Sequence, residues 1–169
     1  MQQIFEDAEI PLQEKQELLE RETKGDASDA TAKSKLTIQA KLPLNEEKEK
    51  LWKWYLDETA KDSDKSLEAS MIGFWNWTQV SLLEPYIDKF FESAIDVCKK
   101  RTTIYCKMYF TYLAPGVGNE KILKSYEDLA KRLGPELKLW KTKVEAAIVN
   151  QKRLLESYEL CKKHYEGKQ

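Results

Sequence analysis

The chain has 169 residues, a length that fits one domain able to bury a core without disulfides or metal ions. Its 28 basic and 29 acidic side chains nearly cancel, so the composition gives no electrostatic basis for binding nucleic acid or an anionic membrane. Five Trp, eight Tyr and five Phe argue against a disordered chain.

Helical periodicity dominates, and no segment alternates convincingly between apolar and polar residues. The first expected helix covers residues 1–8 and places Met1, Ile4 and Phe5 on one face. This helix looks truncated, because it has about two turns and no capping residue before it. An apolar face left open usually marks an interface, so Met1, Ile4 and Phe5 are predicted to contact a partner or a second copy of the chain.

A glycine turn separates the next two expected helices. The first of them covers residues 11–23, because proline is favoured at the first helical position, and it ends before Gly25. Asp26 or Ser28 can cap the following helix, which runs to Pro43.

Two helices carry much of the aromatic content in the middle of the chain. Asn45 is expected to cap the first, which runs to about Leu56 and opens with two glutamates at the positive end of the helix dipole. After a polar turn, residues 66–75 form the second. Thr78 is expected to cap the segment that follows, and Pro85 either to restart or to kink it.

Four more amphipathic segments complete the chain, over residues 87–98, 104–113, 119–133 and from 135 to about 161, the last possibly broken once in its middle. The short connections between them are typical of stacked helical hairpins. We therefore expect a single all-α domain over residues 1–169, built as a HEAT-like α-solenoid of eight or nine stacked antiparallel helices.

The sequence predicts neither a membrane-spanning segment nor a secretory signal. Its longest apolar stretches are only a few residues, and its first residues lack the basic and apolar regions of a secretory signal. Three cysteines, Cys98, Cys106 and Cys161, are too few and too far apart for a disulfide framework. The expected location is the cytoplasm.

No complete catalytic or metal site can be assembled from the sequence. Zinc sites need at least three ligands, whereas this chain has one histidine, His164, one helical turn from Cys161. Cys98 and Cys106 fall on apolar helix faces, so buried structural thiols are favoured over nucleophiles. The glycines around Gly116 lack the lysine and the preceding strand of a phosphate-binding loop.

Aromatic residues are densest around Phe74, Trp75, Trp77 and Tyr86. Large aromatic side chains crowd both protein cores and binding hot spots. At these spacings a core cluster is favoured over a binding surface.

The order of several segments resembles the C-terminal helical domain of zinc aminopeptidases of the aminopeptidase N family, which includes the antigen-trimming aminopeptidases of the endoplasmic reticulum. The resemblance covers roughly residues 4–165, and its most specific piece is Leu82-Leu-Glu-Pro-Tyr-Ile-Asp-Lys-Phe-Phe91. One departure is Cys98, where bacterial relatives often carry Trp. The other segments that carry the resemblance are Ala8-Glu-Ile-Pro-Leu12, Leu18-Leu-Glu-Arg-Glu22, Gly25-Asp26, Ala40-Lys-Leu-Pro43, Lys48 to Trp54, Met71-Ile-Gly-Phe74, Val97 and Arg101-Thr102.

The resemblance implies a role without chemistry of its own. The family holds zinc with a His-Glu-x-x-His helix and a distant glutamate, and binds the substrate amine with a separate Gly-x-Met-Glu-Asn strand; neither motif occurs in this chain. The matching part resembles the wall over the active site, which limits peptide access. We therefore expect no cofactor and no catalytic residue here, with zinc belonging to the parent family, and as partners the catalytic part of an aminopeptidase or a peptide substrate.

Two other classes of function stay open. A stand-alone helical scaffold could bind protein partners, because stacked hairpins present extended surfaces. A free enzyme using Cys98 or Cys106 is disfavoured, because no base is placed to activate either thiol.

Overall fold

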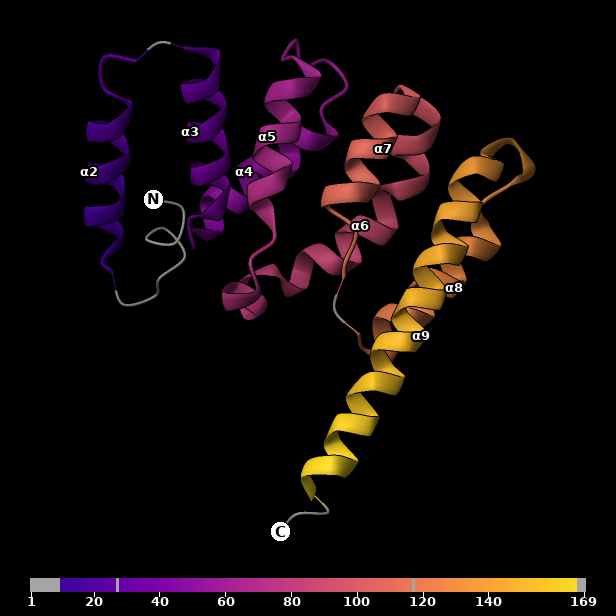
Figure 1. The fold of residues 1–169 in the computed structure, drawn as a ribbon. Coiled ribbons are helices and arrows are strands. Elements are labelled where there is room, and N and C mark those ends of the chain that lie inside the picture. Colours follow the sequence, from indigo (N-terminus) through magenta and orange to yellow (C-terminus); the bar gives the residue numbers. More distant parts are fainter. Residues whose placement is uncertain (1–9, 27, 117, 167–169) are drawn as a thin grey trace. The chain divides into compact units, whose positions relative to one another are not determined.

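The computed structural model describes residues 10–26, 28–116 and 118–166 (Figure 1). Within these ranges the chain forms eight α-helices and two 3-10 helices and has no strand, which confirms the all-α prediction. The helices are α2 (Leu12–Thr23), α3 (Asp29–Lys41), α4 (Asn45–Leu56), α5 (Asp64–Phe74), η1 (Trp77–Gln79), α6 (Val80–Lys100), α7 (Thr103–Tyr112), α8 (Glu120–Arg132), η2 (Pro135–Leu137) and α9 (Lys138–Glu166).

The chain divides into two compact units. Unit 1 comprises residues up to Tyr86 together with Arg101–Leu113, and so contains α2 to α5, the first part of α6, and α7. Unit 2 comprises Ile87–Lys100 and the residues from Ala114 onward, and so contains the second part of α6, α8 and α9.

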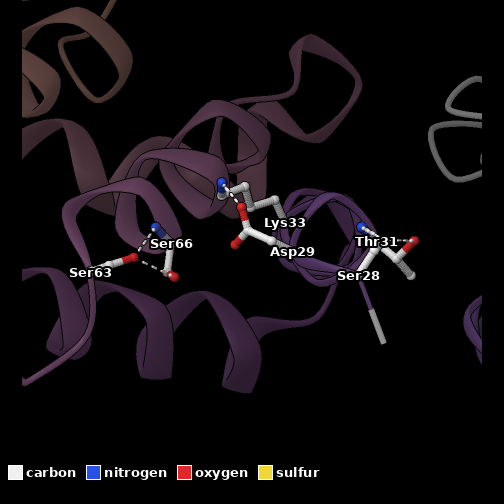
Figure 2. Close-up of polar contacts among 6 residues, drawn as sticks. All are labelled: Ser28, Asp29, Thr31, Lys33, Ser63 and Ser66. Carbon is white, nitrogen blue, oxygen red and sulfur yellow. Dashed lines mark hydrogen bonds and ion pairs between the residues drawn. The ribbon is translucent and has the colours of Figure 1, made fainter. Parts of the chain in front are cut away.

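Serine side chains set the starts of two helices in unit 1 (Figure 2). Ser28 Oγ accepts a hydrogen bond from the backbone N–H of Thr31 at 3.2 Å, and Ser63 Oγ accepts one from Ser66 at the same distance. Each bond satisfies one of the backbone donors that a helix N-terminus leaves unpaired. These caps place the starts of α3 and α5 next to the turns at Gly25, whose φ is 92°, and at residues 57–63.

Unit 1 is held together by a close approach between α3 and α5. A Cβ on Gly73 of α5 would stand 2.1 Å from the carbonyl oxygen of Thr37 in α3, so only glycine fits there. Beside it, Thr37 Oγ1 donates a hydrogen bond to the Ala69 carbonyl oxygen at 2.7 Å. Helix α4 connects α3 to α5 in the sequence. Helix α5 packs against both α3 and α7, which gives a stacked arrangement of helical hairpins.

Unit 2 is built around α8 and α9, which pack along each other (Figure 1). Helix α8 buries Ile122, Tyr126 and Leu129, and the facing part of α9 buries Trp140 and Val144. From α6, Phe91 lies edge-on to Tyr126, with ring centroids 4.8 Å apart. The unit therefore has its own apolar core.

The predicted cap at Asn45 is wrong. Asn45 is the first helical residue of α4, Leu44 precedes it, and no side chain caps this N-terminus. Leu44 packs with Leu42 against the small core cluster that also contains Leu19. Apolar packing thus sets the start of α4 one residue earlier than capping chemistry suggests.

Three details of the later helices also differ, wholly or in part, from what the sequence predicts. Asn76, not Thr78, caps the segment before α6, and its side chain accepts a hydrogen bond from the Thr78 backbone N–H at 3.0 Å. Helix α6 runs through Pro85, so the restart, one of the two alternatives expected there, is wrong, and the kink stays a prediction. Helix α9 is continuous over its 29 residues.

Candidate functional site

The residues singled out from the sequence for an interface, Met1, Ile4 and Phe5, lie outside the described residues, so that prediction stays a prediction. None of the helices in the described part is long and apolar enough to cross a membrane.

The three cysteines occupy two kinds of environment. Cys98 and Cys106 are buried, in agreement with their assignment as structural thiols, whereas Cys161 is exposed. Cys161 and His164 lie one turn apart near the end of α9, and both side chains are exposed. Among the described residues no group of three His, Cys, Asp or Glu side chains could hold a metal ion.

The aromatic cluster is part of the core of unit 1. Phe74 is fully buried and Tyr86 is 1% exposed. Trp52 of α4 contacts both rings, with centroids 5.6 Å from Phe74 and 5.4 Å from Tyr86. Trp75 is half-buried and its Nε1 donates a hydrogen bond to the Leu113 carbonyl oxygen at 2.9 Å. The core interpretation is confirmed for Phe74 and Tyr86; the side chain of Trp77 is outside the described part.

The most unusual polar group is Lys48, which is completely buried in unit 1. Its Nζ donates hydrogen bonds to the carbonyl oxygens of Ala40 at 2.5 Å and of Phe74 at 2.8 Å, and lies 5.0 Å from the centroid of the Phe74 ring. One side chain of α4 therefore satisfies backbone acceptors near the C-terminal ends of both α3 and α5, where the helix dipoles favour a cation. Burial opposes the charge and lowers the pKa of Lys48 to about 7.

The sequence analysis does not predict the burial of Lys48, although the sequence contains a signal for it. It lies on the same helical face as Leu51, Trp52 and Tyr55, three, four and seven residues later. Lysine is rarely buried, so composition places it on the surface by default. The helical periodicity of α4 predicts the burial of Lys48 better than its residue type does.

A second cationic side chain, Arg101, contacts the C-terminal end of α4. Arg101 Nη2 donates a hydrogen bond to the Asp57 carbonyl oxygen at 2.6 Å, and its guanidinium carbon lies 4.3 Å from the centroid of the Tyr105 ring. Tyr105 Oη donates to the Tyr55 carbonyl oxygen at 2.5 Å. Arg101 and Tyr105 thus satisfy carbonyl groups at the C-terminus of α4 that have no partner within the helix.

Among the hollows that the described residues of unit 1 line, two are shallow and lie on α4 or beside it. One of about 340 Å³ lies among α2, α3 and α4 and is lined by Leu19, Leu42 and Leu44 together with polar and charged residues. The other, about 560 Å³, is lined by Asn45, Glu46, Glu49, Lys50 and Lys53 of α4. No cysteine, serine, threonine or histidine is among the described residues that line either of these hollows.

These features describe a helical framework in which the buried Lys48 and the half-buried Arg101 satisfy backbone carbonyl groups at helix ends. No model of a known protein family and no curated protein matches the chain. The function therefore has to be argued from the residues themselves.

Proposed function

We propose that this chain serves as the non-catalytic helical domain of a zinc aminopeptidase of the aminopeptidase N family, and that it forms part of the wall of a chamber that peptides enter. The zinc ion and the groups that bind the substrate amine belong, in this proposal, to polypeptide other than these 169 residues. The role of the chain is steric and orienting, with no bond made or broken by its own side chains.

The proposal rests on one observation: the segments that resemble the aminopeptidase N family supply residues that are buried in the core of each unit. Its most specific segment supplies Leu83 and Tyr86, both buried in unit 1, and Phe90 and Phe91, both buried in unit 2. The segment Met71-Ile-Gly-Phe74 supplies Gly73, at the closest approach of α3 and α5. These residues set the packing of the helices, and a shared framework is what a shared fold requires.

Two of the polar contacts support the same reading. Lys48, at the start of another segment of the resemblance, joins α3, α4 and α5, and Arg101 from the Arg-Thr pair closes the end of α4. A side chain that satisfies several carbonyl groups is costly to lose, because its removal leaves those acceptors without their donor, and the cost is largest for the buried Lys48. Such residues keep a wall rigid, which is what a chamber that sorts peptides by size needs.

The zinc part of the proposal concerns other polypeptide, and no step in this chain is derived through zinc. Cys161 and His164 lie one helical turn apart, and no group of three His, Cys, Asp or Glu side chains among the described residues could hold a metal. Zinc in proteins is held by at least three side chains.

The test has a genetic and a biochemical part. The complete reading frame, or that of a protein that co-purifies with the chain, should encode His-Glu-x-x-His. In that holoenzyme Arg101→Ala should change the rate of peptide trimming more than the rate on a one-residue aminoacyl reporter, because the reporter does not need the chamber wall. The exposed Lys53→Ala of the same unit is the matched control.

Three results would contradict the proposal. The first is a complete reading frame and a set of partners without any zinc-binding motif, which would favour a stand-alone helical scaffold for protein partners. The second is turnover of an aminoacyl reporter by the pure 169-residue chain, abolished by a chelator. The third is an equal effect of Arg101→Ala on peptide and reporter.

A further inference from the structure

Helix α9 is covered along only part of its length. It has 29 residues and α8 has 13, which corresponds to about 43 Å against about 20 Å at 1.5 Å per residue. Trp140, Val144 and Gln151 of α9 are buried within unit 2. They recur every four to seven residues, so they share the face that α8 covers.

The covered part ends where the connection between α7 and α8 meets α9. The Pro115 carbonyl oxygen accepts hydrogen bonds from Tyr126 Oη at 3.0 Å and from Gln151 Nε2 at 3.4 Å. Just before α8, a Cβ on Gly118 would stand 2.7 Å from Leu154 Cβ. Beyond this crossing, each described side chain from Lys152 to His164 is exposed except Leu155, which is half-buried.

The apolar face continues past this point without a change of register. Leu154, Leu155, Tyr158 and Cys161, here called the terminal stripe, follow Gln151 at steps of three and four residues and so extend the face that α8 covers. Leu154 is 45% exposed and Tyr158 64%. The terminal stripe is therefore the direct continuation of an existing helix–helix interface.

Charge distinguishes between the possible occupants of this face. The exposed section from Lys152 to Lys163 carries four cationic side chains and only two anionic ones. At the covered end, Lys152 Nζ lies 3.2 Å from Glu127 Oε1 of α8, so the existing interface already pairs a cation of α9 with an acid of the helix beside it. Two copies of α9 would bring together the same positive excess, which disfavours self-pairing.

We propose that the terminal stripe is a docking surface for an amphipathic helix with acidic flanks, contributed by another polypeptide and lying along α9 in continuation of the line of α8. Leucine or aromatic side chains of the partner would pack on Leu154 and Tyr158, and its acids would face the lysines beside the stripe. This is helix-in-groove recognition, in which anchors spaced by three and four residues give the affinity. The surface does not depend on the aminopeptidase proposal.

Two synthetic probes test this surface on the full chain. One is a fluorescent 14-residue helical peptide with leucines on one face and glutamates beside them, and the other has lysine in place of each glutamate. The variant is Tyr158→Ser. The control is Leu160→Ser, because Leu160 is 68% exposed in the same section but points about 160° around the helix from Tyr158.

We expect the acidic peptide to bind at least ten-fold more tightly than the basic one, and to weaken as salt is added. Tyr158→Ser should reduce its affinity at least five-fold, and Leu160→Ser less than two-fold. Circular dichroism should show both variants folded, because both side chains are exposed. The proposal is overturned by equal binding of both peptides, by no binding of the acidic peptide, by equal losses in both variants, or by self-association of the chain that Tyr158→Ser abolishes.

Discussion

Replacing Lys48 with methionine should change how the stability of unit 1 depends on pH. The ordinary pKa of lysine, 10.5, applies to the unfolded chain, whereas burial lowers the pKa of Lys48 to about 7 in the fold. Between these two values the unfolded chain binds the proton and the folded chain does not. The free energy of unfolding therefore rises with pH in this window, by at most ~1.4 kcal/mol per pH unit from this residue.

The size of the effect follows from the same contacts. From pH 7 to pH 9.5 the wild-type chain should gain up to about 3 kcal/mol from Lys48. Lys48→Met removes this gain and leaves the Ala40 and Phe74 carbonyl oxygens without their lysine donor, at about 1–3 kcal/mol each. Near pH 7 the methionine variant escapes the cost of burying a charge, so the difference between the two proteins should be smallest there.

Urea unfolding at several values between pH 7 and pH 9.5, followed by tryptophan fluorescence, measures this difference. A Trp140→Phe background restricts the signal to unit 1, because the remaining tryptophans at positions 52, 54, 75 and 77 all belong to it. Lys50→Met is the control, since the Lys50 side chain is 73% exposed on the same helix. Curves of free energy against pH that stay parallel for wild type and Lys48→Met would refute the reasoning.

Three further predictions concern other residues. Gly73→Ala should lower stability by about 3 kcal/mol, because its Cβ would stand 2.1 Å from the Thr37 oxygen, whereas Gly116→Ala, with no atom of the described chain within 4 Å, should be nearly neutral in thermal unfolding. Arg101→Lys should cost about 1–2 kcal/mol by urea titration, because lysine cannot both reach the Asp57 carbonyl oxygen and stack on Tyr105; an unchanged midpoint would show that these contacts contribute little. A thiol reagent should modify Cys161 quickly in the native chain and Cys98 and Cys106 only on unfolding, and fast native labelling of either buried thiol would contradict their burial.

Local signals predicted much of the fold. Ser28, one of the two residues expected to cap α3, does cap it, because a side-chain oxygen at a helix start has few alternative uses. Asn45 and Thr78 carry the same chemistry and do not cap α4 and α6, because the packing of Leu44 and the 3-10 turn at Asn76 decide those starts. The packing of Leu44 is a tertiary contact that a local pattern does not show, whereas Asn76 is a second local candidate for the cap and is the one that makes the bond.

The candidate sites also divide into features that the sequence predicts and features that only the fold shows. The absence of the His-Glu-x-x-His motif and the apolar setting of Cys98 could be read from the sequence. The role of Lys48 could not, because it depends on carbonyl groups 8 and 26 residues away that only the fold brings together. The terminal stripe is visible as a pattern, but only the structure shows that α8 covers the preceding turns and not these ones.

The connection before α8 offers a practical use. Pro115 accepts hydrogen bonds from α8 and α9, and Gly118 rests against Leu154 of α9, while Gly116 between them is exposed and has no described atom within 4 Å of its Cβ position. A reporter peptide or a small fluorescent tag inserted directly after Gly116 would leave both anchors in their places. The chain could then be followed inside a larger assembly without disturbing either hydrophobic core.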